Sequence, residues 1–116
     1  MTPDQLQQAW GTGQIVPLVC PAEQDPLRQA WGAADPAALL RQLQQDHGPG
    51  VLVGSGGSLG ARRWCLQPLA HLRASAQATG QWLRLQGLDP ARCLQLNPLP
   101  PHHVSGLMPW VRAWHW

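Results

Sequence analysis

The sequence predicts an α/β fold, because short apolar segments of strand length alternate with segments that have the spacing of amphipathic helices. Ile15 to Cys20 and Val51 to Val53 are the clearest strands, and Leu39 to Leu43 repeats at helical intervals between them. This alternation is typical of a sheet with crossover helices, whose ligands bind beyond the carboxyl ends of the strands. With 116 residues, we expect one domain and a modest core.

Local signals define each element in turn. Asp35 is a suitable N-cap, Pro36 suits the first helical position and Gly48 follows the last turn, so a helix is predicted between them. Gly80 interrupts another helical pattern and weakens it. The predicted elements are helix 4–10, strand 15–20, helix 36–47, strand 51–53, extended arm 63–66, helix 68–87, strand 92–96, a proline loop over 97–101 and a helix with apolar positions at 104, 107 and 111.

Charge and composition exclude several classes of protein. The net charge of +2 comes from arginines that are scattered apart from Arg62 and Arg63, whereas nucleic-acid binding needs a clustered basic face. Glu23 is the sole glutamate, so paired catalytic acids are difficult to assemble. No signal sequence or membrane-spanning apolar run is present, and we expect a cytoplasmic chain. The cysteines are odd in number and lie in apolar runs, which favours reduced core residues: Cys20, Cys65 and Cys93.

The segment from Gly54 to Arg63 has the composition of a phosphate-binding loop. Glycines bring backbone N–H groups close to an anion, while serine hydroxyls and arginine guanidinium groups add donors and charge. An ordinary turn is the simplest alternative. A Walker loop would need Gly-Lys-Ser or Gly-Lys-Thr, a dinucleotide fold would need a later acidic residue, and a hydrolase using Ser55 or Ser58 would need a nucleophile elbow that runs into a helix. The loop instead joins two strand-like arms.

A metal site is not predicted. His102 and His103 are adjacent and therefore point in different directions, and their separations from Cys93 and His115 do not match a zinc-ligand array.

Two motifs together resemble the adenylate-forming acyl-CoA synthetase (AMP-binding) superfamily. Residues 55–63 are similar to its Thr-Ser-Gly-Thr-Thr-Gly-x-Pro-Lys loop, and residues 99–107 to its Leu-Pro-x-x-His-Val-x-Gly-Leu motif. Residues 69–75 lie between them and are similar to the helix that usually follows the loop. Within the superfamily, the chain looks most like the 2-succinylbenzoate:CoA ligases of menaquinone and phylloquinone synthesis.

The resemblance implies ATP-driven activation of a carboxylic acid to an acyl adenylate, followed by thioester formation with coenzyme A. The substrate would be o-succinylbenzoate, and the full-length family also uses Mg²⁺. The residues that would hold the ATP phosphates are Ser55, Gly56, Gly57, Ser58 and Gly60, with Arg63 in place of the family's lysine. His103 would line the acyl pocket, with Ser105 and Gly106 shaping its wall.

The chain also departs from the family pattern. Gly56, Leu59, Arg62 and Arg63 replace the motif's serine, second threonine, proline and lysine, and no lysine occurs anywhere. The resemblance implies that the chain is an N-terminal fragment, a single partial AMP-binding N-terminal domain over residues 1–116 with an incomplete sheet. Residues 1–50 would be its family-variable part and residues 51–116 would carry both motifs, with the missing C-terminal remainder of the enzyme as partner. The alternatives are a stand-alone, non-catalytic nucleotide-binding or partner-docking module, or a degenerate pseudoenzyme.

Overall fold

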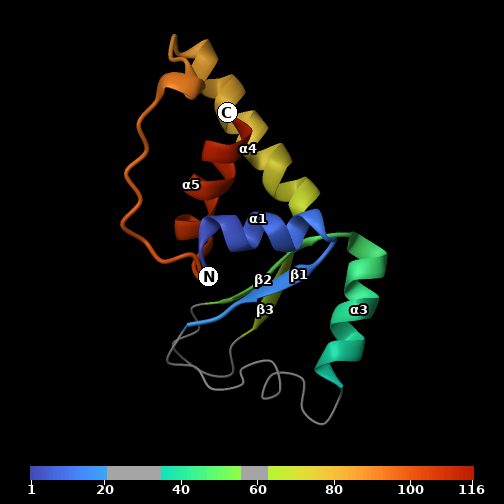
Figure 1. Ribbon diagram of the computed structural model, residues 1–116. Coiled ribbons are helices and arrows are strands. Elements are labelled where there is room, and N and C mark those ends of the chain that lie inside the picture. Colours follow the sequence, from blue (N-terminus) through green and yellow to red (C-terminus); the bar gives the residue numbers. More distant parts are fainter. Residues whose placement is uncertain (21–34, 56–62) are drawn as a thin grey trace. The chain divides into compact units, whose positions relative to one another are not determined.

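The computed structural model describes residues 1–20, 35–55 and 63–116 (Figure 1). It contains helices and a three-stranded, incomplete sheet, which confirms the general α/β class. Contacts divide the chain into two compact units, Met1–Leu69 and Ala70–Trp116. The single partial AMP-binding domain over 1–116 stays a prediction, and the two units are described separately below.

The first unit holds the sheet, in the order β1-β2-β3. β1 pairs in parallel with β2, and β2 pairs in antiparallel fashion with β3. A parallel pair needs a long crossover, and α3 lies on that connection, as the alternation predicted. The elements of this unit are α1 (Pro3–Gly11), β1 (Ile15–Leu18), α3 (Pro36–His47), β2 (Gly50–Gly54) and β3 (Trp64–Pro68).

Both helices of the first unit begin at side-chain caps. Thr2 and Gln5 form a reciprocal capping box at the start of α1. The Asp35 carboxylate accepts hydrogen bonds from the backbone N–H groups of Ala37 and Ala38, which confirms it as the N-cap of α3. The Asp35 cap was predicted from the sequence, whereas the first helix was predicted from residue 4 and begins at Pro3, after the Thr2 cap.

A buried indole joins α1 to the central strand. Trp10 is 7% exposed, and its Nε1–H donates to the Gly50 carbonyl over 2.9 Å. The buried apolar residues of this unit come from α1, from the strands and from the start of the helix that follows β3: Leu6, Trp10, Ile15, Val16, Leu18, Val51, Leu52, Val53 and Leu69. Burial of this apolar surface stabilises the sheet that carries the candidate phosphate loop.

We expect Trp10→Phe to lower the free energy of unfolding by about 1.5 kcal/mol, because it deletes a buried donor and part of the indole volume. Equilibrium urea unfolding followed by far-ultraviolet circular dichroism measures the change. The matched control is Trp82→Phe, at a tryptophan that is 58% exposed. Equal stability of the two variants would contradict the role given to the indole bond.

The outer edge of β1 offers no free N–H donor at Ile15 or Pro17. Gly50 donates its N–H to the Gln14 carbonyl, so Gln14 faces β2. Because the backbone groups of successive residues in a strand point to opposite edges, the backbone nitrogens of Ile15 and Pro17 face away from β2. The Ile15 N–H is bound by the side-chain oxygen of Gln44, and proline has no N–H. Blocked edges of this kind prevent unwanted strand pairing.

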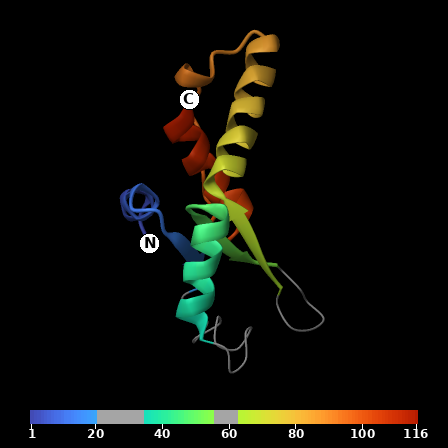
Figure 2. The same ribbon diagram turned by 90° about the vertical axis from the view of Figure 1, so that its right-hand side faces the viewer.

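The second unit contains two helices that lie side by side (Figure 2). The first of these helices is α4 (Leu69–Leu85), all of which belongs to this unit except its first residue. The second is α5 (Val104–His115), and a short 3₁₀ turn, η1 (Pro90–Arg92), lies between the two in the sequence. The Trp116 indole donates its N–H to the Ala76 carbonyl over 2.8 Å and lies against Gly80. Gly80 therefore lies inside α4, and its lack of a side chain leaves space for this indole.

The predicted strand over residues 92–96 is wrong. Asp89 caps the 3₁₀ turn at Pro90–Arg92, and the chain then runs without regular secondary structure to the start of α5. No described strand pairs with this stretch, and Leu94 and Leu96 are 98% and 93% exposed. Alternating apolar residues favour a strand, but a strand needs a neighbour to satisfy its backbone groups.

The cysteines are free thiols, but they are not core residues. Cys65 is exposed, and Cys20 and Cys93 are half-buried. Cys65 lies in an edge strand, and Cys93 follows the 3₁₀ turn, where its Sγ donates to the Asp89 carbonyl over 3.2 Å. An apolar sequence neighbourhood was therefore a poor guide to burial here.

Among the described ranges, none of the helices has both the length and the apolar character required to cross a lipid bilayer.

Candidate functional site

Ser55 and Arg63 close the mouth of the glycine and serine loop. The ladder between β2 and β3 ends at the pair Gly54 and Trp64. One step further, the Ser55 N–H donates to the Arg63 carbonyl over 2.7 Å, and the Arg63 N–H donates to Ser55 Oγ over 3.1 Å. The serine hydroxyl thus replaces the carbonyl that would continue the ladder, and both ends of the loop are fixed to each other.

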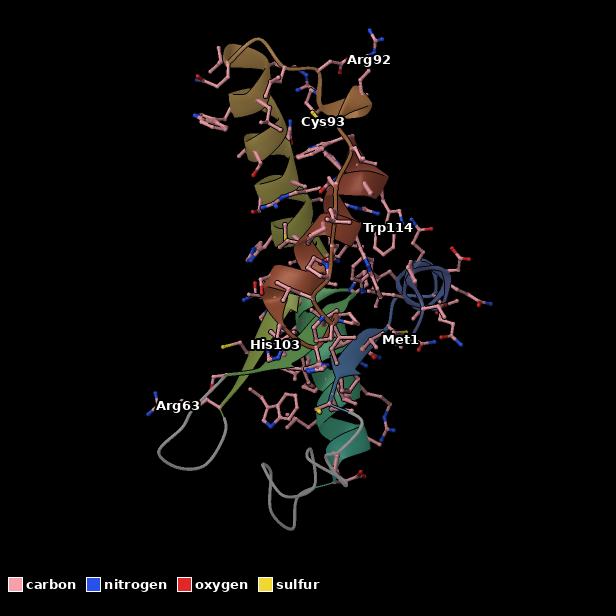
Figure 3. All side chains as sticks on the ribbon, turned by 90° about the vertical axis from the view of Figure 1, so that its left-hand side faces the viewer. Met1, Arg63, Arg92, Cys93, His103 and Trp114 are labelled. Atoms are coloured by element: carbon pink, nitrogen blue, oxygen red, sulfur yellow. The ribbon has the colours of Figure 1, made fainter. Side chains whose placement is uncertain are left out.

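These bonds determine which groups of Ser55 and Arg63 can meet an anion. Both backbone N–H groups are used at the mouth, so the expected contribution of the Ser55 N–H to phosphate binding is not available in this arrangement. Ser55 Oγ accepts one bond and still carries a hydroxyl proton to donate. The Arg63 residue is exposed, and its side chain points away from the strands (Figure 3). A hydroxyl donor and a guanidinium group therefore flank the loop.

The remaining phosphate-loop residues of the sequence prediction lie outside the described residues. They are Gly56, Gly57, Ser58 and Gly60, together with Leu59, Ala61 and Arg62 of the same motif.

The structural context of the loop is a hairpin. β2 is buried through Val51, Leu52 and Val53, and it provides a fixed arm on the N-terminal side. The C-terminal arm is β3, and helix α4 begins only after it. The predicted connection between two extended arms is confirmed, and it differs from the strand-to-helix turn of a Walker loop.

The second motif forms a hydrogen-bonded turn into α5, within the second unit. His103 has extended backbone dihedral angles and is the N-cap of the helix. Its N–H donates to the Pro100 carbonyl over 3.2 Å, and its carbonyl accepts from Gly106 and Leu107 over 2.9 and 3.0 Å. The backbone of His103 is therefore held on both sides.

The side chain of His103 does not cap the helix. The residue is exposed, and its ring lies 4.5 Å from that of His102 between centroids (Figure 3). Ser105, in the first turn of α5, is also exposed. Helix N-termini favour anions, and the imidazole and hydroxyl groups of these residues lie on that first turn.

Gly106 is buried, and it lies against the proline loop. A Cβ atom at this position would collide with the Pro100 carbonyl and would lie 2.8 Å from the Leu99 carbonyl oxygen. Gly106 is thus a point of close backbone approach between the loop and α5.

Asn97 was missed by the reasoning from sequence. Its Nδ2 donates to the Gly106 carbonyl over 2.8 Å, and its Oδ1 accepts from the Leu99 N–H over 3.3 Å. The signal that could have found it is the dipeptide Asn97-Pro98, since asparagine commonly accepts a bond from the backbone two residues later.

The sequence-predicted residues therefore fall into two local groups. Ser55 and Arg63 meet in the first unit, while His103, Ser105 and Gly106 share one turn in the second. Within the described part of the chain, no cluster of three or more His, Cys, Asp or Glu side chains has the arrangement of a metal site.

Comparison with known proteins finds no matching family model, no matching curated protein and no matching solved structure.

Proposed function

We propose that the chain carries the ATP-phosphate loop and part of the acyl site of an AMP-forming acid:CoA ligase. The observation that carries the proposal is the hairpin whose glycine and serine loop is closed at its mouth by Ser55 and Arg63. Closing the mouth reduces the conformational freedom that the loop would lose on binding a phosphate chain. The order of the two motifs along the chain supports the superfamily, and the His-Val-Ser-Gly-Leu form of the second motif, residues 103–107, supports o-succinylbenzoate as the acid.

In the proposed first reaction, a carboxylate oxygen of the acid forms a bond to the α-phosphorus of ATP. The bond between the α-phosphorus and the bridging oxygen breaks, and its electron pair leaves with pyrophosphate. The Ser55 hydroxyl and the Arg63 guanidinium would bind the phosphate oxygens on which negative charge increases. Mg²⁺ would neutralise part of the same charge. The sulfur of coenzyme A then forms a bond to the acyl carbon, the bond between that carbon and the phosphate oxygen breaks, and AMP leaves with its electron pair while the thiol proton passes to solvent.

His103 would contact the carboxylic acid through its imidazole, and Ser105 would offer a hydroxyl donor beside it. Both groups are exposed on the first turn of α5, whereas the backbone of His103 is fixed by Pro100, Gly106 and Leu107. This arrangement supports a binding role, in which a fixed backbone presents a polar side chain to the ligand.

Titration with MgATP, followed by the NMR amide signals of Ser55 and Arg63, tests the nucleotide part. We expect millimolar affinity for the chain alone, because these residues supply one part of a nucleotide site. Arg63→Ala should weaken the affinity about tenfold by removing a charge-assisted hydrogen bond. The control is Arg41→Ala on α3, an exposed arginine in the same unit whose loss changes the net charge equally. Equal affinity in the two variants would contradict the assignment.

The catalytic part is tested with a hybrid enzyme, in which residues 51–116 replace the matching segment of an active 2-succinylbenzoate:CoA ligase. The expected result is exchange of pyrophosphate into ATP that depends on o-succinylbenzoate. A folded hybrid without such exchange would exclude the proposed ligase function.

A second candidate function is a stand-alone, non-catalytic module that binds a nucleotide or docks on a partner chain, and the exposure of Leu94 and Leu96 favours docking. Micromolar binding of ATP by the chain alone, together with an inactive hybrid, would support this module over the ligase.

A further inference from the structure

We propose that Asn97 is the positioning residue of the candidate acyl site: its side-chain amide holds the turn that presents His103, without contact with the ligand. The inference rests on the proposed function, because it assigns a role toward the carboxylic acid. It concerns a residue outside both family motifs, since the second motif begins at Leu99.

The first argument is the shortage of backbone donors in the proline loop. Between Pro98 and Pro101, Leu99 is the one residue that has an N–H group, because the other three are prolines. That N–H donates to Asn97 Oδ1 over 3.3 Å. The loop therefore has too few N–H groups to be held by hydrogen bonds between its own backbone groups. The Asn97 side chain accepts the single hydrogen bond that Leu99 can donate.

The second argument is the path from Asn97 to His103. Asn97 Nδ2 donates to the carbonyl of Gly106, and the N–H of Gly106 donates to the carbonyl of His103. His103 in turn donates its N–H to Pro100, at the other end of the loop. These hydrogen bonds connect Asn97, the proline loop and the first turn of α5. His103 takes part in two of them, one to the loop and one to the helical turn.

The third argument is the absence of the usual restraint at the start of a helix. His103 is the N-cap of α5, but its side chain makes no capping bond. A capping side chain normally fixes the first turn. Here the amide of Asn97 donates to a carbonyl of that turn and holds it from outside the helix, while the exposed imidazole of His103 makes no capping bond.

Asn97→Asp is the decisive variant. It keeps an acceptor for Leu99, but it places a carboxylate oxygen where Nδ2 donates to the Gly106 carbonyl. The matched control is Gln95→Glu, the same amide-to-carboxylate change two residues earlier, at a half-buried position in the same extended stretch. Both variants add one negative charge, so general repulsion of an anionic ligand affects them equally.

The measurement is titration of the full chain with o-succinylbenzoate, followed by the NMR signals of the His103 imidazole and of the Val104 and Ser105 amides. We expect millimolar affinity for the unmodified chain, at least a tenfold loss in Asn97→Asp and a change below about twofold in Gln95→Glu. The MgATP-induced shifts of Ser55 and Arg63 should be the same in all three proteins.

The Trp116 indole N–H signal shows whether a variant has merely unfolded, because this group is bonded to Ala76 in the packing of α4 and α5. A lost indole bond in Asn97→Asp, with affinity retained in a folded Asn97→Ser variant, would assign Asn97 a structural role and overturn the inference. Asn97→Ser removes the amide donor without adding charge, and we expect it to lose affinity in the same way.

The two proposals fail in different ways. A chain that responds to MgATP at Ser55 and Arg63 but not to o-succinylbenzoate at His103 overturns the inference and leaves the nucleotide site standing. Equal acid affinity in Asn97→Asp and Gln95→Glu also overturns it. A chain that responds to neither ligand overturns the inference and the proposed function together.

Discussion

Gly106→Ala should destabilise the second unit by about 3 kcal/mol, one of the two largest effects that we expect from a single substitution. The added Cβ would collide with the Pro100 carbonyl, and the other close atoms are also backbone: the Pro100 carbonyl carbon at 2.7 Å and the Leu99 oxygen at 2.8 Å. A change of rotamer cannot relieve a clash with backbone. The proline loop would have to move away from α5, which also breaks the bond between Asn97 and Gly106.

Amide hydrogen exchange of α5 measures this effect, since it reports the opening of that helix by itself. Ser105→Ala is the control, because it changes the exposed neighbouring residue in the same helical turn and should alter stability by less than about 0.5 kcal/mol. If Gly106→Ala leaves the exchange rates of α5 at those of the control, the close approach of the loop and the helix is not as described.

Gly50→Ala should destabilise the first unit by a similar amount, about 3 kcal/mol. Gly50 pairs with Pro68 at the base of the hairpin, and its Cβ would collide with the Gln67 carbonyl and lie 3.0 Å from the Pro68 Cα. β2 and β3 would have to separate at this end. The carbonyl of Gly50 also accepts the bond from the Trp10 indole, so a shift of β2 weakens the attachment of α1.

Urea unfolding and amide exchange in β2 and β3 test the Gly50 substitution. Gly11→Ala, at the last residue of α1 with no other atom within 4 Å of the added Cβ, should be neutral or stabilise the chain by up to about 1 kcal/mol. Equal stability of the Gly50→Ala and Gly11→Ala variants would refute the close contact between the two strands.

The helix starts and the hairpin could be predicted from the sequence because short-range interactions specify them. Asp35 binds N–H groups two and three residues away, and Pro36 is compatible with the first helical position. The two apolar arms around the loop likewise identified β2 and β3. The phosphate-binding and acyl-binding roles stay predictions, and part of the phosphate loop lies outside the described residues.

Features that depend on partners distant in the sequence could not be predicted in this way. Gly80 weakened a helix in the sequence, but the indole of Trp116, thirty-six positions later, lies against it. The alternating leucines at 94 and 96 indicated a strand, although no described strand lies beside them. Asn97 gained its importance from a bond to Gly106, nine residues away.

The two edges of the described sheet differ in the N–H donors that they offer. At the outer edge of β1, Pro17 has no N–H and the Ile15 N–H is bound by the Gln44 side chain, so an additional strand would pair more favourably at β3, the other edge. β3 begins at Trp64, directly after Arg63. A protein segment that extended this sheet at β3 would therefore lie next to the arginine at the mouth of the candidate phosphate loop, so one short strand would serve both the sheet edge and the loop.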